Sequence, residues 1–142
     1  MLSSETMISM ADGSKKNISN LNAGDWILNK LNKPIKVKSV NVFQNQECVQ
    51  IQLNNGTPVF YISADSKVYA VTQNPITSMY TTIADAFSKQ AKLKKDLKTF
   101  SSSSDVNIET FDQAHPVVKT LYSFDVQDST KTFIGNGVIL CC

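Results

Sequence analysis

The sequence predicts a single, mostly β domain with one helix. Two stretches at the beginning and the end of the chain alternate apolar and polar residues and are divided by tight polar turns, as β-strands are. Between these stretches, residues 81–100 carry the spacing of an amphipathic helix. At 142 residues the chain is long enough for one domain with a hydrophobic core of its own. We expect a β half over residues 1–73, a helical and serine-rich insertion over 74–106 and a second β half over 107–142.

The first half contains short strands at close spacing. The segments that alternate, or carry short apolar runs between turn residues, are residues 6–10, 25–29, 34–43, 48–53, 59–63 and 67–72. Asp12-Gly13 is a hairpin-type turn after the first of them. In the third segment the apolar positions shift phase between Val37 and Val40, which indicates a β-bulge. We expect Trp26 to pack on the sheet and Cys48 to be buried and inert.

The middle of the chain predicts one helix over residues 81–100. Thr82 is placed to cap its N-terminus with Asp85 in the reciprocal position, and Ile83, Phe87 and Ala91 would line one face. Its lysines form a basic face that we expect to be a solvated helix end, favoured by the helix dipole. They are Lys89, Lys92, Lys94, Lys95 and Lys98. The serines at 101–104 would form a flexible joint.

The last part of the chain returns to β structure. Residues 116–128 and 132–140 read as strands, with a hairpin turn at Asn136-Gly137. The chain then ends on Cys141 and Cys142 directly after an apolar run, which is unusual because a strand of this kind belongs inside a fold. Disulfide geometry is strained between adjacent residues, so the pair is not expected to form a disulfide.

Composition excludes several classes of function. All 14 basic residues are lysine, and the net charge of +2 is too small to indicate nucleic acid or an anionic membrane as a partner. The chain has no apolar stretch of the roughly 20 residues that span a bilayer and no signal peptide at its start. Three irregularly spaced cysteines argue against a disulfide scaffold and favour a reducing, intracellular compartment. We therefore expect a monomer with no cofactor and no metal.

Both ends of the chain resemble the Hint domains, the fold shared by inteins, bacterial intein-like domains and hedgehog autoprocessing domains. Residues 61–71 resemble an internal block of the same family. The N-terminal positions that match are Leu2, Thr6, Ile8, Asp12-Gly13, Leu21, Gly24-Asp25 and Ile27. The C-terminal positions that match are Tyr122, Val126, Phe133 and Asn136-Gly137. The resemblance implies a horseshoe of long, curved antiparallel strands with pseudo-two-fold symmetry and both termini at its centre.

The resemblance also implies a self-processing reaction, and the chain departs from it at every reacting position. In the family a side chain at the first residue attacks the preceding carbonyl, an internal Thr and His assist, and a terminal His-Asn pair releases the other end. Here Met1 stands at the nucleophile position, and Ser63 replaces the Thr. Ser66 replaces the internal His, Ser123 an Asp, Cys141 the terminal His and Cys142 the terminal Asn. Serine offers no base that titrates near neutral pH.

Each of these residues also has a plainer interpretation. Ser63 and Asp65 fit strand-end and turn positions. Ser123 would act as a nucleophile only beside a base, and none is visible in the sequence. Cys141 and Cys142 could serve as acyl acceptors, as a prenylated pair, or as the small apolar end of a strand. His115 precedes a proline in a loop-like segment and reads as a solitary surface residue.

Three functions follow as hypotheses. The first is an intein-like domain of protein splicing or autoproteolysis that acts on its own chain, in a degenerate or inactivated form, with the flanking host segments (exteins) as partners in cis. The second is a non-catalytic Hint-derived module with a structural or interaction role in a larger host protein. The third is a protein prenylated on its terminal cysteine pair.

Overall fold

The structure is a computed structural model that describes residues 1–72, 75–95, 97 and 105–142. The strands are β1 Met7–Ser9, β2 Lys15–Asn17, β3 Trp26–Leu28, β4 Pro34–Leu53, β5 Phe60–Ile62, β6 Lys67–Thr72, β7 Thr77–Thr82, β8 Lys92–Leu93, β9 Ile108–Phe111, β10 Val117–Val126, β11 Thr132–Gly135 and β12 Val138–Cys141. The helices are η1 Ile18–Asn20 and α1 Ile83–Ser88. The predicted mostly β architecture is confirmed. Within the described residues, no helix has the length and hydropathy that crossing a bilayer requires.

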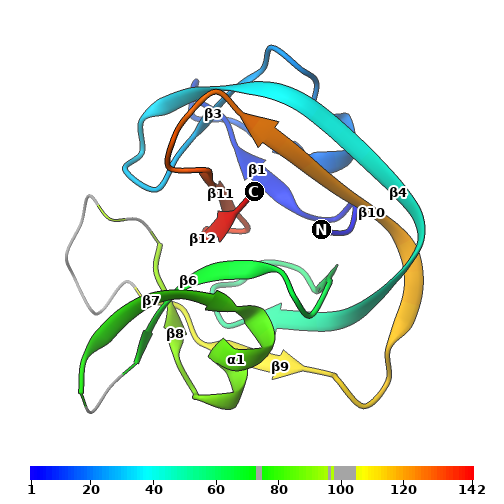
Figure 1. The fold of residues 1–142 in the computed structure, drawn as a ribbon, viewed down its shortest axis with the longest axis vertical. Helices are drawn as coiled ribbons and strands as arrows, with labels where there is room; N and C mark the ends of the chain where they lie inside the picture. The colour runs from blue at the N-terminus through cyan, green and yellow to red at the C-terminus, as the bar shows by residue number, and fades with distance from the viewer. Residues whose placement is uncertain (73–74, 96, 98–104) are drawn as a thin grey trace.

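One side of the molecule is a long curved ribbon made of β4 and β10 (Figure 1). β4 runs for 20 residues and joins the two predicted segments 34–43 and 48–53 into one strand. It pairs with β3 at its start and with β5 and β9 at its end. The pairing of β4 with β10 slips in register between Asp125 and Val126, opposite Ser39 and Val37. The bulge predicted from the phase shift in this segment is therefore confirmed.

The second sheet has the order β2-β1-β11-β12-β6-β7, with β8 attached to β6. β11 and β12 form a hairpin whose turn residues Asn136 and Gly137 have φ values of 48° and 79°. Positive φ at both central residues is the twist that a two-residue hairpin turn needs, and Asn-Gly adopts it readily. β12 lies between β11 and β6, and Val138, Ile139 and Leu140 are buried. The last strand is thus an interior strand of the sheet.

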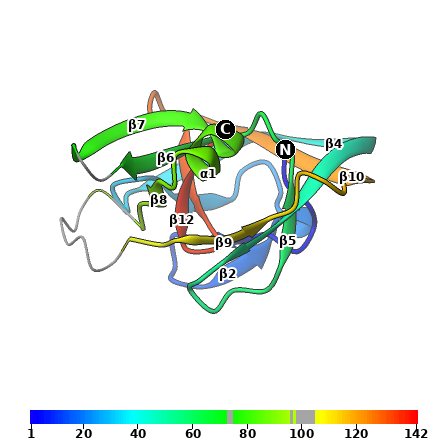
Figure 2. The same ribbon diagram turned by 90° about the horizontal axis from the view of Figure 1, so that it is seen from below.

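The two chain ends lie near one another in both views (Figure 1, Figure 2). The reason is that each end is hydrogen-bonded into the fold. Leu2 bridges both Tyr122 of β10 and Ile62 of β5, while β12 is held between β11 and β6. Leu2, Ile62, Phe133 and Leu140 belong to the same buried core.

The predicted helix over residues 81–100 is wrong in length, because α1 spans only Ile83–Ser88. Its N-terminus agrees with the prediction, since the Asp85 N–H donates to the Thr82 side chain at 3.2 Å. After the helix, Gln90 takes a φ of 53° and turns the chain back along β6. Leu93 is 1% exposed in this short return strand. Burial of Leu93 against β6 outweighs the helical propensity of the segment.

The predicted solvated basic helix end is also wrong. Lys94 lies after β8, and its ammonium contacts the Asp105 carboxylate at 3.0 Å with side chains only 13% and 1% exposed. Lys98 and the predicted serine joint at 101–104 lie outside the described residues. Trp26 does not pack on the sheet as expected but is 53% exposed, because the alternation of β3 turns Ile27 inward instead. Cys48 is buried, as predicted.

Candidate functional site

The first three residues form a short strand between β5 and β10. The Leu2 N–H donates to the Tyr122 carbonyl at 2.9 Å, and the Tyr122 N–H donates to the Leu2 carbonyl at 2.7 Å. On the other side, the Ser63 N–H donates to the Met1 carbonyl at 3.1 Å and the Ser3 N–H donates to the Tyr61 carbonyl at 2.9 Å. Bonds on both sides fix the position and direction of the first residue.

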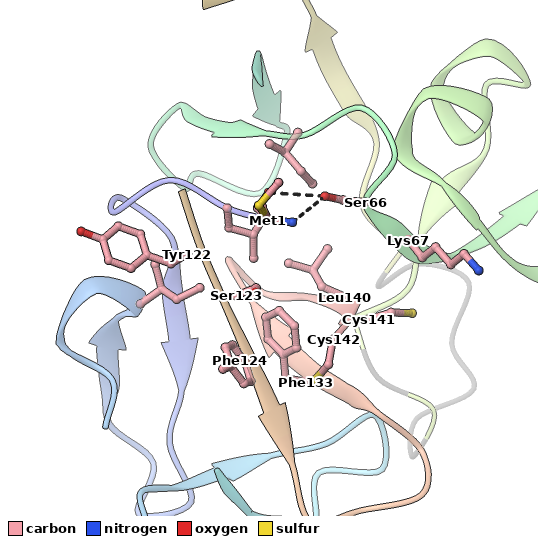
Figure 3. A pocket seen from close by; sticks show the side chains of 13 residues that line it. Met1, Ser66, Lys67, Tyr122, Ser123, Phe124, Phe133, Leu140, Cys141 and Cys142 are labelled. Atoms are coloured by element: carbon pink, nitrogen blue, oxygen red, sulfur yellow. Dashed lines mark hydrogen bonds between the residues drawn. The ribbon is translucent and has the colours of Figure 1, made fainter. Parts of the chain in front are cut away.

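Two serine hydroxyls, of Ser63 and Ser66, contact the backbone of Met1, and Figure 3 shows the contact with Ser66. The Met1 ammonium donates to Ser66 Oγ at 3.0 Å and to Ser63 Oγ at 3.2 Å. The two hydroxyls are 2.7 Å apart and lie 3.3 Å and 3.4 Å from the Met1 carbonyl oxygen. Ser63 follows β5 and Ser66 precedes β6, so the turn between these strands positions both.

Burial lowers the pKa of the Met1 ammonium, and the nearby Asp65 carboxylate opposes this shift. A buried amine loses hydration of its charged form, which favours the neutral amine. The surroundings of this nitrogen are therefore suited to an uncharged group, such as a peptide N–H, as well as to an ammonium.

The terminal cysteines and Ser123 line the pocket beside Met1 (Figure 3). The remaining walls are mainly apolar and come from Leu2, Ile18, Ile62, Tyr122, Phe124, Phe133 and Leu140. Cys141 ends β12, and the Cys142 N–H donates to the Lys131 carbonyl at 2.9 Å. Ser63 and Asp65 line the adjoining rim, so the five other predicted site residues all gather around Met1.

Both thiols are poorly ionised. Burial raises the pKa of the Cys141 thiol, against the opposing effect of Lys67 and Lys30. Cys142 is exposed as a whole residue, yet burial of its thiol raises the pKa to about 12. The thiolate is the reactive form of cysteine, so neither thiol is prepared for nucleophilic attack near neutral pH.

The rate of alkylation measures how strongly burial suppresses ionisation of the Cys142 thiol. A pKa of about 12 in place of the ordinary 9.0 reduces the thiolate at pH 8 by roughly a thousandfold. We expect iodoacetamide to modify Cys142 in the folded chain at least ~10-fold more slowly than in the urea-unfolded chain. Peptide mass spectrometry gives both rates, and equal rates would contradict the assigned burial of the thiol.

His115 and Lys67 are the two residues whose place relative to this pocket is still to be described. His115 is absent from this pocket; its side chain is 81% exposed and its Nδ1 lies 2.9 Å from an Asp112 carboxylate oxygen. It is a surface residue, as predicted. The sequence reasoning missed Lys67, which lines the pocket directly after Ser66. Its place directly after Ser66 in the sequence was the one signal that could have identified it.

Among the described residues, no group of three or more His, Cys, Asp or Glu side chains converges as a metal site would require.

The chain matches no protein-family model and no curated protein. Solved structures do match it over its whole length. The crystal structure of the MchDnaB-1 intein covers 100% of both chains with a TM-score of 0.72 at 16% identity. The DnaB intein from Synechocystis sp. PCC 6803 covers 99% of this chain and 96% of its own, with a TM-score of 0.71 at 13% identity. The bacterial intein-like domain from Clostridium thermocellum covers 96% and 93%, with a TM-score of 0.68 at 20% identity.

These likenesses establish the fold. The chain has the Hint-type fold of inteins and bacterial intein-like domains, as the resemblance of its two ends implied. At 13–20% identity they do not carry over the chemistry of any single neighbour. The roles of the six site residues therefore remain predictions.

Proposed function

We propose that the chain is an intein-like domain that stays joined to the host segments flanking it, because it lacks the groups that would cut either junction. The proposal rests on the hydrogen bonds that surround the backbone of Met1. Its backbone nitrogen and carbonyl are held by Ser63 and Ser66, as a site for a scissile peptide requires, while the side chains that would react are absent.

The first junction lacks a nucleophile. Cleavage there needs a thiol or hydroxyl on the first residue to attack the preceding carbonyl and form an ester or thioester. Met1 carries a thioether, which has no proton to lose and cannot form a neutral acyl product. Ser66, 3.0 Å from the Met1 nitrogen, can hold this atom by a hydrogen bond but cannot supply a proton as an imidazolium does.

The second junction lacks an intramolecular leaving step. Release in the family proceeds by attack of a terminal Asn side-chain amide on its own carbonyl. Cys142 has no amide, and its thiol has a pKa of about 12. Cys141, at the position of the penultimate His, is a thiol whose pKa burial also raises. Neither residue supports the cyclisation that the family uses.

An intein-like domain that is never cleaved would remain in its host as a non-catalytic module. The proposal therefore combines the hypothesis of an inactivated intein-like domain with that of a non-catalytic Hint-derived module. The prenylation hypothesis receives less support. Cys141 pairs with Thr132 in the β11–β12 hairpin, and Cys142 is bonded to Lys131. Cysteines held in a sheet are less accessible to an enzyme than cysteines on a free tail.

A fusion protein tests the proposal. We place one reporter domain before Met1 and another after Cys142, then incubate with and without dithiothreitol between pH 6 and 9 for several days. We expect intact mass spectra throughout, with no released reporter and no ligated pair. A reporter thioester, a thiol-released reporter or a spliced product would overturn the proposal. An active intein between the same reporters serves as the positive control.

A further inference from the structure

We propose that the polypeptide preceding Met1 in a longer chain docks on β10 as an added β-strand, in a fixed register that pairs the residue before Met1 with Phe124. This inference rests on the proposed function, because it identifies how the flanking segment is held. It concerns the intact chain and requires no cleavage.

The register follows from the existing ladder. Leu2 and Tyr122 exchange both backbone hydrogen bonds, at 2.9 Å and 2.7 Å, which is a hydrogen-bonded pair of an antiparallel ladder. Such pairs recur every second residue on each strand. Met1 therefore faces Ser123 as a non-bonded pair, and its nitrogen and carbonyl point to Ser63 and Ser66 instead, as observed. The residue before Met1 falls opposite Phe124.

The edge of β10 at Phe124 is available for this pairing. Backbone N–H and carbonyl groups of a strand point to the same edge at every second residue. Phe124 is two residues after Tyr122, so its N–H and carbonyl also point away from β4 and toward the edge that Leu2 occupies. β10 pairs with β4 along one edge, and on its other edge the described residues form one bridge, between Tyr122 and Leu2, and none at Phe124. Met1, Ser123 and Phe124 line one pocket (Figure 3).

The docked strand is short. The ladder of β10 is interrupted between Asp125 and Val126, where the register with β4 shifts. The Val126 N–H is already bonded to the Asp125 side chain at 2.9 Å. A bulge of this kind ends regular pairing. The structure therefore assigns two flanking residues to the docking strand, the one opposite Phe124 and the one opposite Asp125.

The site also favours a type of residue before Met1. Directly paired residues of a sheet point to the same face, so this side chain lies on the face of Leu2 and Phe124, which are 5% and 4% exposed. The pocket wall there is formed by Phe124 and Phe133. A charged side chain would be buried without a partner, and proline would remove the N–H that bonds to Phe124. An apolar residue other than proline fits.

Amide hydrogen exchange measured by NMR tests the register. We compare the chain starting at Met1 with the same chain preceded by Ser-Gly-Gly-Ser-Val. We expect the Phe124 amide to exchange roughly tenfold or more slowly in the extended chain. The Tyr122 amide, already bonded to Leu2, is the internal control and stays unchanged. Replacing the added Val by Pro or Asp is expected to remove most of the Phe124 protection, and unchanged Phe124 exchange in the Val chain would overturn the proposal.

A disulfide test checks the second position. In a Cys141→Ser, Cys142→Ser background, a cysteine two residues before Met1 is expected to cross-link with Asp125→Cys, because facing strand residues have the separation a disulfide needs. A cysteine five residues before Met1 is the matched control and is expected to remain free. Equal yields would contradict the register. Both tests use intact chains, so cleavage, which would overturn the proposed function, is detected separately by mass.

Discussion

Placing histidine at position 66 is expected to give the largest gain of activity that a single residue can produce in this site. In a Met1→Cys background with an upstream reporter, Ser66→His should raise the rate of dithiothreitol-induced reporter release by roughly 10²–10⁴-fold over Met1→Cys alone. The new Cys thiol attacks the preceding carbonyl, its proton is lost, and the Met1-position nitrogen must gain a proton as it becomes an amine. An imidazolium supplies that proton, whereas serine does not.

The geometry makes position 66 the correct one to change. Ser66 Oγ is 3.0 Å from the nitrogen that must be protonated, and Ser63 Oγ is 3.2 Å from it. Ser63 can keep the hydrogen bond to the carbonyl side while the imidazole takes the nitrogen side. Dithiothreitol then exchanges with the thioester and frees the reporter as a thioester of known mass.

Two controls make this experiment decisive. Ala64→His adds an imidazole at an exposed position two residues away and is expected to leave the rate within about twofold of Met1→Cys, since proton transfer requires hydrogen-bond contact. Ser66→Ala removes the hydrogen bond and should not accelerate release. If Ser66→His gives no more release than Ala64→His, the assignment of position 66 to the general acid site is wrong.

The fold was predictable where the pattern of the sequence is local. Asn136-Gly137 between two apolar runs specifies a hairpin, and the phase shift after Val37 specifies a bulge; both are present. The continuity of β4 was harder to predict, because residues 44–47 are polar, are exposed except for the half-buried Gln46, and interrupt the alternation. β10 pairs with β4 on both sides of a register shift in this stretch, with Phe43 opposite Leu121 and Gln46 opposite Lys119.

The edge strands β2 and β7, and the short strand β8 that runs back along β6 after α1, were not predicted, and the reason is physical. β7 pairs with β6 alone and buries no residue fully, so its sequence carries no alternation of apolar residues. β2 is a similar edge strand with two lysines. The segment after Ser88 has good helix-forming residues, and its return along β6 depends on burying Leu93, which only the tertiary structure determines.

The sequence allowed us to predict which residues form the site, but not how they interact. The resemblance at both ends located Met1 and Cys142, the resemblance of residues 61–71 located Ser66, and the structure gathers all three in one pocket. Neither the pairing of Met1 nitrogen with two serine hydroxyls nor the burial of the Cys142 thiol follows from residue types. Both depend on which strands neighbour the first and last residues.

Loss of the Lys94 ammonium is expected to cause the largest destabilisation of the fold by a charge. Lys94 Nζ contacts Asp105 Oδ1 at 3.0 Å, and this oxygen makes no hydrogen bond to the described residues. Removing one member of a buried ion pair leaves the other charge uncompensated, at a cost of about 3–5 kcal/mol. We therefore expect Lys94→Ala to lower the free energy of unfolding by this amount, as measured by urea unfolding followed by circular dichroism.

The position of the pair explains why the loss would affect the whole fold and not the segment after α1 alone. The Lys94 N–H donates to the Tyr69 carbonyl of β6 at 3.3 Å, and its carbonyl accepts from the Ile139 N–H of β12 at 2.9 Å. Lys94 thus joins the segment after α1 to β6 and to β12, the strand that ends at Cys141. Lys95→Ala, at an exposed neighbour, is the matched control and should stay within about 0.5 kcal/mol. Replacing both Lys94 and Asp105 by Leu should recover most of the loss, because no charge is then left buried alone. A Lys94→Ala effect no larger than that of Lys95→Ala would mean that water, and not the protein, compensates the Asp105 carboxylate.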